Sequence, residues 1–209
     1  MNIEGWRSLR GKLFFTTEDI AAQFGITRAS AHVFCNRQAK KGAFIRLRKD
    51  FYLLGERWPY LDRQDFFVIA NYLQVPSYLS CTTALVYHGL TTQAPRGWYE
   101  SVALKRSIRY SADNTTFSYF KLKRECYFGF TKIGSFFMAA KEKAFLDACH
   151  LCAYGRYALD WSALDIDRLD KSALETMMAP FPDRTRKMVK RICRILSSRN
   201  SSKWRFWTD

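Results

Sequence analysis

The stretch Thr16–Gly55, TTEDIAAQFGITRASAHVFCNRQAKKGAFIRLRKDFYLLG, decides the fold of the first part of the chain. A threonine pair followed by acidic residues is typical of a helix start, and Gly25 is typical of the turn after a short helix. Thr27 predicts the start of a second helix that runs to about Lys41, with Gly42 beyond its end. Two short helices joined by a tight turn predict a helix-turn-helix.

The residues that follow predict a β-hairpin. Apolar residues alternate in two runs, Ala43–Leu47 and Phe51–Leu54, and a short basic turn joins them. Asp50 stands where left-handed backbone is usual, and aspartate tolerates that conformation. A basic hairpin directly after the second helix is typical of a wing. We therefore predict a winged helix-turn-helix DNA-binding domain over residues 1–58.

The second helix carries basic and polar side chains on the stripe opposite its apolar one. In a recognition helix such side chains enter the major groove, where arginine reads guanine and asparagine reads adenine, while basic residues of a wing hold phosphates. The candidate DNA-binding residues are Thr27, Arg28, Ser30, His32, Asn36, Arg37 and Lys40 on the helix, and Arg46, Arg48 and Lys49 on the wing. For His32 we favour a phosphate or water contact, or a spacer role, over base reading. Protein contacts or a solvated basic face are the alternatives for the whole unit.

Composition narrows the class of protein. The net charge is +15, and most of the excess falls in residues 1–60 and 184–209, which favours surfaces that face a polyanion. A hydrophobic content of 48% excludes a disordered chain. No apolar run reaches the length of a membrane span, and the first residues lack a signal-peptide pattern, so we expect a cytoplasmic protein with no membrane partner.

Residues 59–209 predict a second, α+β domain with a small antiparallel sheet and a helical end. Aromatic and β-branched residues are concentrated in three strand-like runs, at 98–110, 115–124 and 126–137. A basic helix over 183–199 is expected to begin at Asp183. Its buried stripe would be Met188, Ile192, Ile195 and Leu196. Its outer stripe would be Arg184, Lys187, Arg191 and Arg194, a candidate surface for a partner protein or for DNA backbone. Beyond it, we favour docking of Trp204, Phe206 and Trp207 on the domain over stacking on bases.

The sequence offers only weak candidates for a catalytic site or a metal site. The spacing of Glu142, Lys143 and Asp147 suits an ion-paired helix better than a metal site. Cys149 and Cys152 lack a second ligand pair, which favours a buried helix with free thiols. His88, and equally His150, are interpreted as structural. We therefore expect no enzyme, no metal and no cofactor, with a nucleic-acid enzyme as the less favoured alternative.

Three segments resemble one family: LRKDFYLLG (47–55), PSYLSCTTALVYHGLT (76–91) and MAAKEKAFLDACHL (138–151). Together with the N-terminal pattern they are similar to the AbiEi-type antitoxins of abortive-infection toxin–antitoxin systems, from about Phe14 to Cys152. The resemblance implies a cytoplasmic antitoxin whose winged helix binds inverted repeats in its own promoter and represses the operon. It also implies that the C-terminal domain opposes a cognate nucleotidyltransferase-like toxin without forming a stable complex.

Two positions depart from the family pattern. Gln38 stands where the family commonly has leucine, and Lys49-Asp50 replaces a frequent Arg-Gly at the wing turn, which reduces the expected grip on phosphate. One winged helix reads only a short half-site, so we expect two copies on DNA, from a monomer or a dimer in solution. The alternative function is a stand-alone winged-helix transcription factor whose C-terminal domain senses a ligand or partner.

Overall fold

The computed structural model describes residues 3–93 and 95–200, with side chains described for residues 6–93 and 95–196. Its first elements are α1 (Ile3–Arg10), β1 (Phe15–Thr16), α2 (Thr17–Phe24), α3 (Arg28–Lys40), β2 (Phe44–Arg48) and β3 (Phe51–Leu54). Thr16 caps α2, because its hydroxyl accepts the Asp19 N–H at 3.1 Å while the Asp19 carboxylate accepts the Thr16 N–H at 2.8 Å. Gly25, with a φ of 63°, ends this helix as the sequence predicts.

The β2–β3 hairpin packs against two hydrophobic cores at once. Strands β1, β3 and β2 form an antiparallel sheet in that order. Since side chains alternate between the faces of a strand, Tyr52 and Leu54 join a small core under α1–α3, while Phe51 and Leu53 join the large core that fills the rest of the molecule. The hairpin therefore fastens the three N-terminal helices to the remainder of the chain. The domain boundary at residue 58 stays a prediction.

The remainder of the chain is built around a six-stranded sheet. Before and within it lie η1 (Gly55–Tyr60), α4 (Arg63–Leu73), β4 (Ser77–Leu79), α5 (Cys81–Tyr87), β5 (Trp98–Ala103), β6 (Ile108–Ala112), β7 (Thr115–Lys121), η2 (Arg124–Cys126), β8 (Phe130–Ile133) and β9 (Phe136–Ala139). After it come α6 (Lys141–Ala153), η3 (Trp161–Ala163), η4 (Ile166–Arg168), α7 (Lys171–Met178) and α8 (Asp183–Asn200). The strand order is β6-β7-β5-β4-β9-β8. The α+β class predicted from the sequence is thus confirmed.

The predicted small antiparallel sheet is wrong in size and direction. The sheet is mixed, because β5 pairs in parallel with β7 and β4 pairs in parallel with β9. Strand β4 has three residues, too few to show an alternating pattern in the sequence. Its pairing of Leu79 with Met138 joins positions far apart in sequence, which local periodicity does not record.

A buried charged cluster ties α6 to β4. Lys143 and Asp147 form an ion pair with both side chains 0% exposed. The Asp147 carboxylate also accepts the hydroxyls of Tyr78 at 2.9 Å and Ser80 at 2.8 Å, and Lys143 donates to Tyr78 at 2.8 Å. The sequence interpretation of an ion-paired helix is confirmed, with the pair inside the core. Cys149 of the same helix is fully buried, and none of the six cysteines, each in the described part of the chain, forms a disulfide.

The last helix differs from its prediction at one residue. Ile192 and Leu196 are buried as expected and Met188 is partly buried, but Ile195 is 44% exposed. Val189 and Cys193 take the buried positions instead, because they share the inner face with Ile192 when the helix is followed at 100° per residue. Trp204, Phe206 and Trp207 lie outside the described residues.

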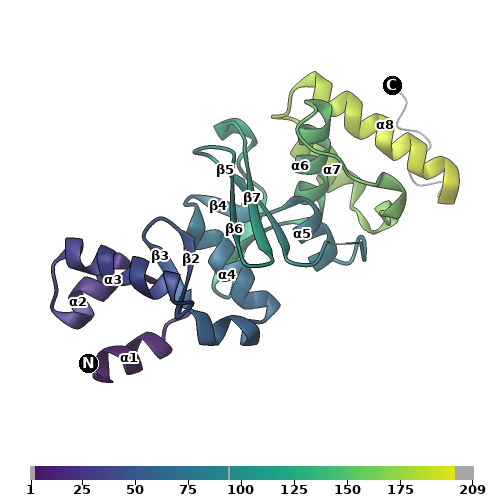
Figure 1. Cartoon of the computed structure of the whole chain (residues 1–209). Helices are drawn as coiled ribbons and strands as arrows, with labels where there is room; N and C mark the ends of the chain where they lie inside the picture. The colour runs from purple at the N-terminus through teal and green to yellow at the C-terminus, as the bar shows by residue number, and fades with distance from the viewer. Residues whose placement is uncertain (1–2, 94, 201–209) are drawn as a thin grey trace.

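Figure 1 shows an elongated molecule with α1–α3 at one end, the six-stranded sheet in the middle and α8 at the other end. The described parts of the two basic ends of the sequence are therefore far apart in space. Across the described ranges, every helix is too short or too polar to cross a bilayer.

Candidate nucleic-acid interface

Helix α3 is held rigidly against the small core. The Thr27 hydroxyl caps it by accepting the Ser30 N–H at 3.2 Å. On its inner face Ala31 and Cys35 are completely buried, and burial raises the pKa of the Cys35 thiol to about 11. Aromatic packing fixes the remaining side, since the Phe34 ring lies 5.4 Å from that of Phe24 and about as close to two other rings. This packing leaves one face of α3 directed away from the protein.

The outward face of α3 is polar, basic and continuous. Its exposed residues are Arg28, Ala29, Ser30, Val33, Asn36, Arg37 and Lys40. All the helix candidates predicted from the sequence belong to this face or to its N-terminal end, except His32. We call this set of exposed residues the α3 face.

At the N-terminal end of α3 two predicted residues have local partners. Thr27 is used as the cap, and its hydroxyl also donates to the Ser30 hydroxyl at 2.9 Å. The Arg28 guanidinium lies 3.4 Å from the Glu18 carboxylate, with both side chains mostly exposed. An exposed pair of this kind is weak and can be exchanged for a phosphate.

His32 lies at the border between α3 and the hairpin. Its Nδ1 is 3.2 Å from the Asp50 carboxylate, which also accepts the Thr17 hydroxyl at 3.1 Å. Asp50 has the left-handed backbone expected from the sequence, with a φ of 61°. One carboxylate thus joins α2, α3 and the hairpin turn. The geometry matches the spacer role suggested for His32, because its ring is engaged with the hairpin.

The three predicted wing residues do not lie together. Arg46 and Lys49 are exposed, whereas Arg48 is half-buried, with its guanidinium 5.3 Å from the centre of the Phe51 ring. The Arg48 Nε is buried without a hydrogen-bond partner among the described residues. A register shift between Arg46 and Arg48 explains the difference, because a bulge breaks the alternation that would place both on one face. Arg48 thus points toward the large core, on the side where β2 contacts β6.

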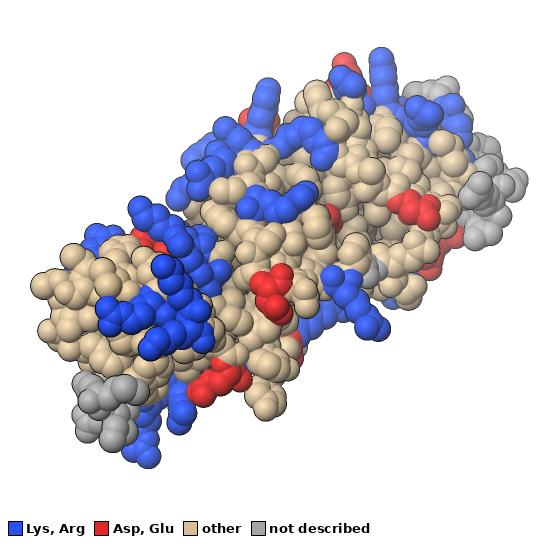
Figure 2. All heavy atoms as spheres, viewed as in Figure 1, with Lys and Arg blue, Asp and Glu red and all other residues tan. Residues whose placement is uncertain are grey.

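The surroundings of the α3 face are basic. Figure 2 shows Lys and Arg side chains gathered over the N-terminal unit, with few acidic side chains among them. Two acids close to α3, Asp19 and Asp50, already have partners: Asp19 pairs with Lys12 and Asp50 with His32. The positive charge of Arg37, Lys40, Arg46 and Lys49 has no carboxylate partner within the described residues, and it is free to attract a polyanion.

A second basic surface lies at the other end of the molecule. Arg184, Lys187, Arg191 and Arg194 are all exposed on α8, as the sequence predicts. Arg184 lies over the ring of Tyr154, 5.0 Å from its centre. Because α8 and α3 occupy opposite ends of the molecule, these residues do not extend the α3 face (Figure 1).

Sequence reasoning missed two residues of the α3 face, Ala29 and Val33. Val33 is 58% exposed and lies at the centre of the face, between Ala29 and Arg37. The predicted stripe advanced in i, i+4 steps from Arg28. Because four residues are slightly more than one helical turn, such a row winds around the helix, and it passes through His32 instead of Val33. An isolated β-branched apolar residue three before Asn36 was the signal that could have shown where the exposed face is centred.

Comparisons with known proteins bear on the fold alone. No protein-family model matches this chain, and no curated protein matches it. Among solved structures, the crystal structure of the Rv2827c protein from Mycobacterium tuberculosis is similar to it, with a TM-score of 0.58 and 14% sequence identity. The similarity covers 91% of this chain and 73% of that chain. The arrangement of helices and sheets described above therefore occurs in a second protein of very different sequence.

Proposed function

We propose that this chain is a DNA-binding repressor whose N-terminal winged helix-turn-helix inserts the α3 face into the major groove. The observation that carries the proposal is the face itself: a capped, rigid helix presents arginine, lysine and asparagine side chains, and no acid in the described part of the chain pairs with its central residues. Phosphates attract such a surface without regard to sequence, and base edges select among the polar side chains.

Each part of the interface has its own task in this proposal. Asn36 and Arg37 read base edges, and Val33 contacts a thymine methyl group, the apolar feature of the major groove. Arg46 and Lys49 hold phosphates and set the register of α3 on the duplex. The Asp50–His32 contact keeps the hairpin at a fixed angle to α3. We assign Arg48 to packing between the hairpin and the large core.

The biological role proposed is that of an AbiEi-type antitoxin, and it rests on the sequence resemblance. Two copies would bind an inverted repeat in the promoter of their own toxin–antitoxin operon and repress it. The C-terminal domain would oppose a nucleotidyltransferase-like toxin. The exposed cations of α8 support a role in that task better than a role in DNA binding, because they lie at the end of the molecule opposite α3.

A second candidate function keeps the DNA-binding domain and replaces the antitoxin role by ligand sensing. It is favoured by one observation, a cavity of about 620 Å³ in the C-terminal part that holds a buried carboxylate. Co-expression separates the two candidates. An antitoxin restores growth of cells that express the product of the adjacent gene, whereas a ligand-sensing regulator leaves growth unchanged and alters only transcription.

DNA binding is tested with a labelled fragment of the gene's own upstream region, across a series of salt concentrations. Wild type should bind tightly, with affinity falling steeply as salt rises. Arg37→Ala/Lys40→Ala should bind more weakly by about 100-fold or more, since each charged contact contributes about 1.5–3 kcal/mol. Lys132→Ala, which removes an exposed lysine of β8, is the matched control and should bind like wild type. Equal, weak binding by all three proteins would refute the proposal.

A further inference from the structure

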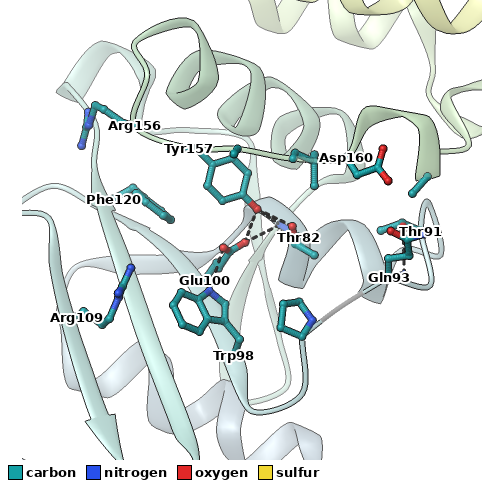
Figure 3. A pocket seen from close by; sticks show the side chains of 14 residues that line it. Thr82, Thr91, Gln93, Trp98, Glu100, Arg109, Phe120, Arg156, Tyr157 and Asp160 are labelled. Carbon is teal, nitrogen blue, oxygen red and sulfur yellow. Dashed lines mark hydrogen bonds between the residues drawn. The ribbon is translucent and has the colours of Figure 1, made fainter.

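A cavity of about 620 Å³ opens beside the six-stranded sheet, outside the α3 face and the basic surface of α8. Strands β5, β6 and β7 form one side of it, and the start of α5 and the segment after α6 form the other (Figure 3). The volume falls within the range usual for small-molecule sites. Its lining combines an acidic floor, an aromatic wall and two arginines.

Glu100 forms the floor and is 5% exposed. One carboxylate oxygen accepts the Tyr157 hydroxyl at 2.7 Å and the Thr82 N–H at 2.9 Å, and the other accepts the Trp98 indole N–H at 3.1 Å. No lysine or arginine of the described residues pairs with Glu100. Since a carboxylate oxygen accepts about two hydrogen bonds, the second oxygen can take a further donor from a ligand.

Arg109 and Arg156 stand on the opposite side of the cavity from Thr91 and Asp160 (Figure 3). The Arg109 guanidinium stacks 4.7 Å from the Trp98 ring centre and donates to the Ser118 hydroxyl at 3.2 Å. Arg156 donates to the Ser107 hydroxyl at 2.8 Å and to the Lys121 carbonyl at 3.2 Å. Neutral acceptors thus hold both guanidinium groups in place, and no described carboxylate neutralises them. Two fixed, uncompensated guanidinium groups are suited to a phosphate.

Aromatic side chains separate the carboxylate from the two arginines. Phe120 lies between Arg109 and Arg156, and its ring centre is 5.5 Å from that of Tyr157 (Figure 3). Trp98 completes the wall below Glu100. A planar ring placed against this wall would have a hydrogen-bond acceptor at one edge and positive charge toward its other side.

We propose that the cavity binds a nucleotide, with the base against Trp98 and Phe120, an exocyclic amino group donating to Glu100 and a phosphate held by the guanidinium groups of Arg109 and Arg156. Adenine, cytosine and guanine carry such an amino group, whereas uracil presents carbonyl oxygens at the same positions and meets the carboxylate unfavourably. The order of affinities should therefore place uridine nucleotides last.

The nucleotide is either free or the end of a polynucleotide. Exposed basic residues lie at the neighbouring strand ends, and these are Lys105, Arg106, Lys121, Lys123 and Arg124. Lys121 adjoins the cavity through its carbonyl, which accepts from Arg156, and Lys123 lies 3.9 Å from the exposed Glu125 carboxylate. A polynucleotide end would use these basic residues for its further phosphates, so its affinity would exceed that of the mononucleotide and fall more steeply with salt. A free nucleotide would gain nothing from them.

Isothermal titration of the full chain with AMP, CMP, GMP and UMP tests the proposal. Wild type should bind at least one amino-bearing nucleotide about tenfold or more tightly than UMP, and Arg109→Ala and Arg156→Ala should each weaken that binding about tenfold or more. Both arginines are exposed, so these variants should keep the fold, and a thermal melt checks it. Lys132→Ala on β8 is the matched charge control and should bind as wild type does.

Two further experiments decide whether the nucleotide is free or part of a polynucleotide, and what Glu100 contributes. Binding of short single-stranded RNA and DNA is compared with binding of the mononucleotide, in wild type and in Lys121→Ala/Lys123→Ala. If the oligonucleotide binds more tightly than the mononucleotide and the double variant loses this gain, the ligand is a polynucleotide end. If the oligonucleotide and the mononucleotide bind equally, the ligand is a free nucleotide. Glu100→Gln should reduce the preference over UMP while leaving the phosphate contacts. Absence of binding to every mononucleotide and oligonucleotide at about 1 mM, or equal binding by wild type and both arginine variants, would overturn the proposal.

Discussion

Helices α3 and α6 have the same length, thirteen residues, and both carry charged side chains, yet they use them in opposite ways. On α6, Lys143 and Asp147 are 0% exposed and neutralise each other. On α3, Arg37 and Lys40 are exposed and unpaired within the described residues. A buried pair fixes the position of its helix, whereas an unpaired exposed charge is available to a partner. Charge alone therefore says little about function until its burial is known.

The largest effect is expected when the buried pair is broken. Asp147→Ala leaves the Lys143 ammonium without its partner in the core, and it should lower the free energy of unfolding by about 3–5 kcal/mol. Urea denaturation followed by circular dichroism measures this. The double variant Lys143→Met/Asp147→Leu removes both charges and should recover most of the loss. A single variant as stable as wild type would show that the pair does not hold α6 in place.

On α3 the largest effect is expected at Val33. Val33→Glu places a negative charge at the centre of the α3 face, and repulsion from the phosphates should lower the affinity for the upstream DNA about 100-fold. Because the side chain is 58% exposed, the thermal midpoint should stay within about 2 °C of wild type. Fluorescence anisotropy gives the affinity. Val33→Ala is the control and should cost less than about tenfold; an unchanged affinity in Val33→Glu would remove Val33 from the interface.

The pH dependence of stability should depend on His150, a further titratable group of α6. Burial, reinforced by the charge of Lys143, lowers its pKa to about 4, and its Nδ1 is hydrogen-bonded to the Thr185 hydroxyl at 2.7 Å. The unfolded chain takes up a proton near the ordinary pKa of 6.5, whereas the folded chain does so only near 4, so stability is complete above pH 6.5 and is lost as the pH falls toward 4.

Since the ring is only partly buried, the loss should be about 1–2 kcal/mol. Denaturation of wild type and His150→Gln at several pH values between 7 and 4 measures it. The variant should show a shallower decline over this range. Identical pH profiles for the two proteins would contradict the assignment.

The smallest effect is expected at the cap of α3. Thr27→Ala removes the hydroxyl that accepts the Ser30 N–H and should lower the free energy of unfolding by about 1 kcal/mol. Thr27→Ser keeps the cap and should retain wild-type stability. If the loss of DNA-binding free energy in Thr27→Ala is far larger than its loss of unfolding free energy, Thr27 contacts the DNA as well.

Local signals account for what the sequence predicted well. The capping residues Thr16 and Thr27, the turn at Gly25 and the alternation of Phe51–Leu54 act within a few residues, and each element formed as expected. Long-range effects account for the errors. Strand β4 exists because of its pairing with β5 and β9, and the bulge that turns Arg48 inward arises from the pairing of β2 with β3.

The candidate sites show the same division. The exposed cations of α3 follow from helical periodicity. The prediction nevertheless placed the centre of the face on the neighbouring row of residues along the helix, and not at Val33. The cavity around Glu100 was not predictable, because its floor joins residues from β5, the start of α5 and the segment after α6. Nothing in the sequence near Glu100 indicates that Tyr157 is its hydrogen-bond partner.

The central claim is that the α3 face reads DNA sequence while the hairpin only holds phosphates. The most direct test is the ratio of affinities for the upstream fragment and for a shuffled fragment of the same composition, measured for wild type, Arg37→Ala and Lys49→Ala. The account predicts that Arg37→Ala lowers this ratio about tenfold or more, whereas Lys49→Ala weakens binding to both fragments equally and leaves the ratio unchanged. A ratio near one for wild type, or an unchanged ratio in Arg37→Ala, would contradict it.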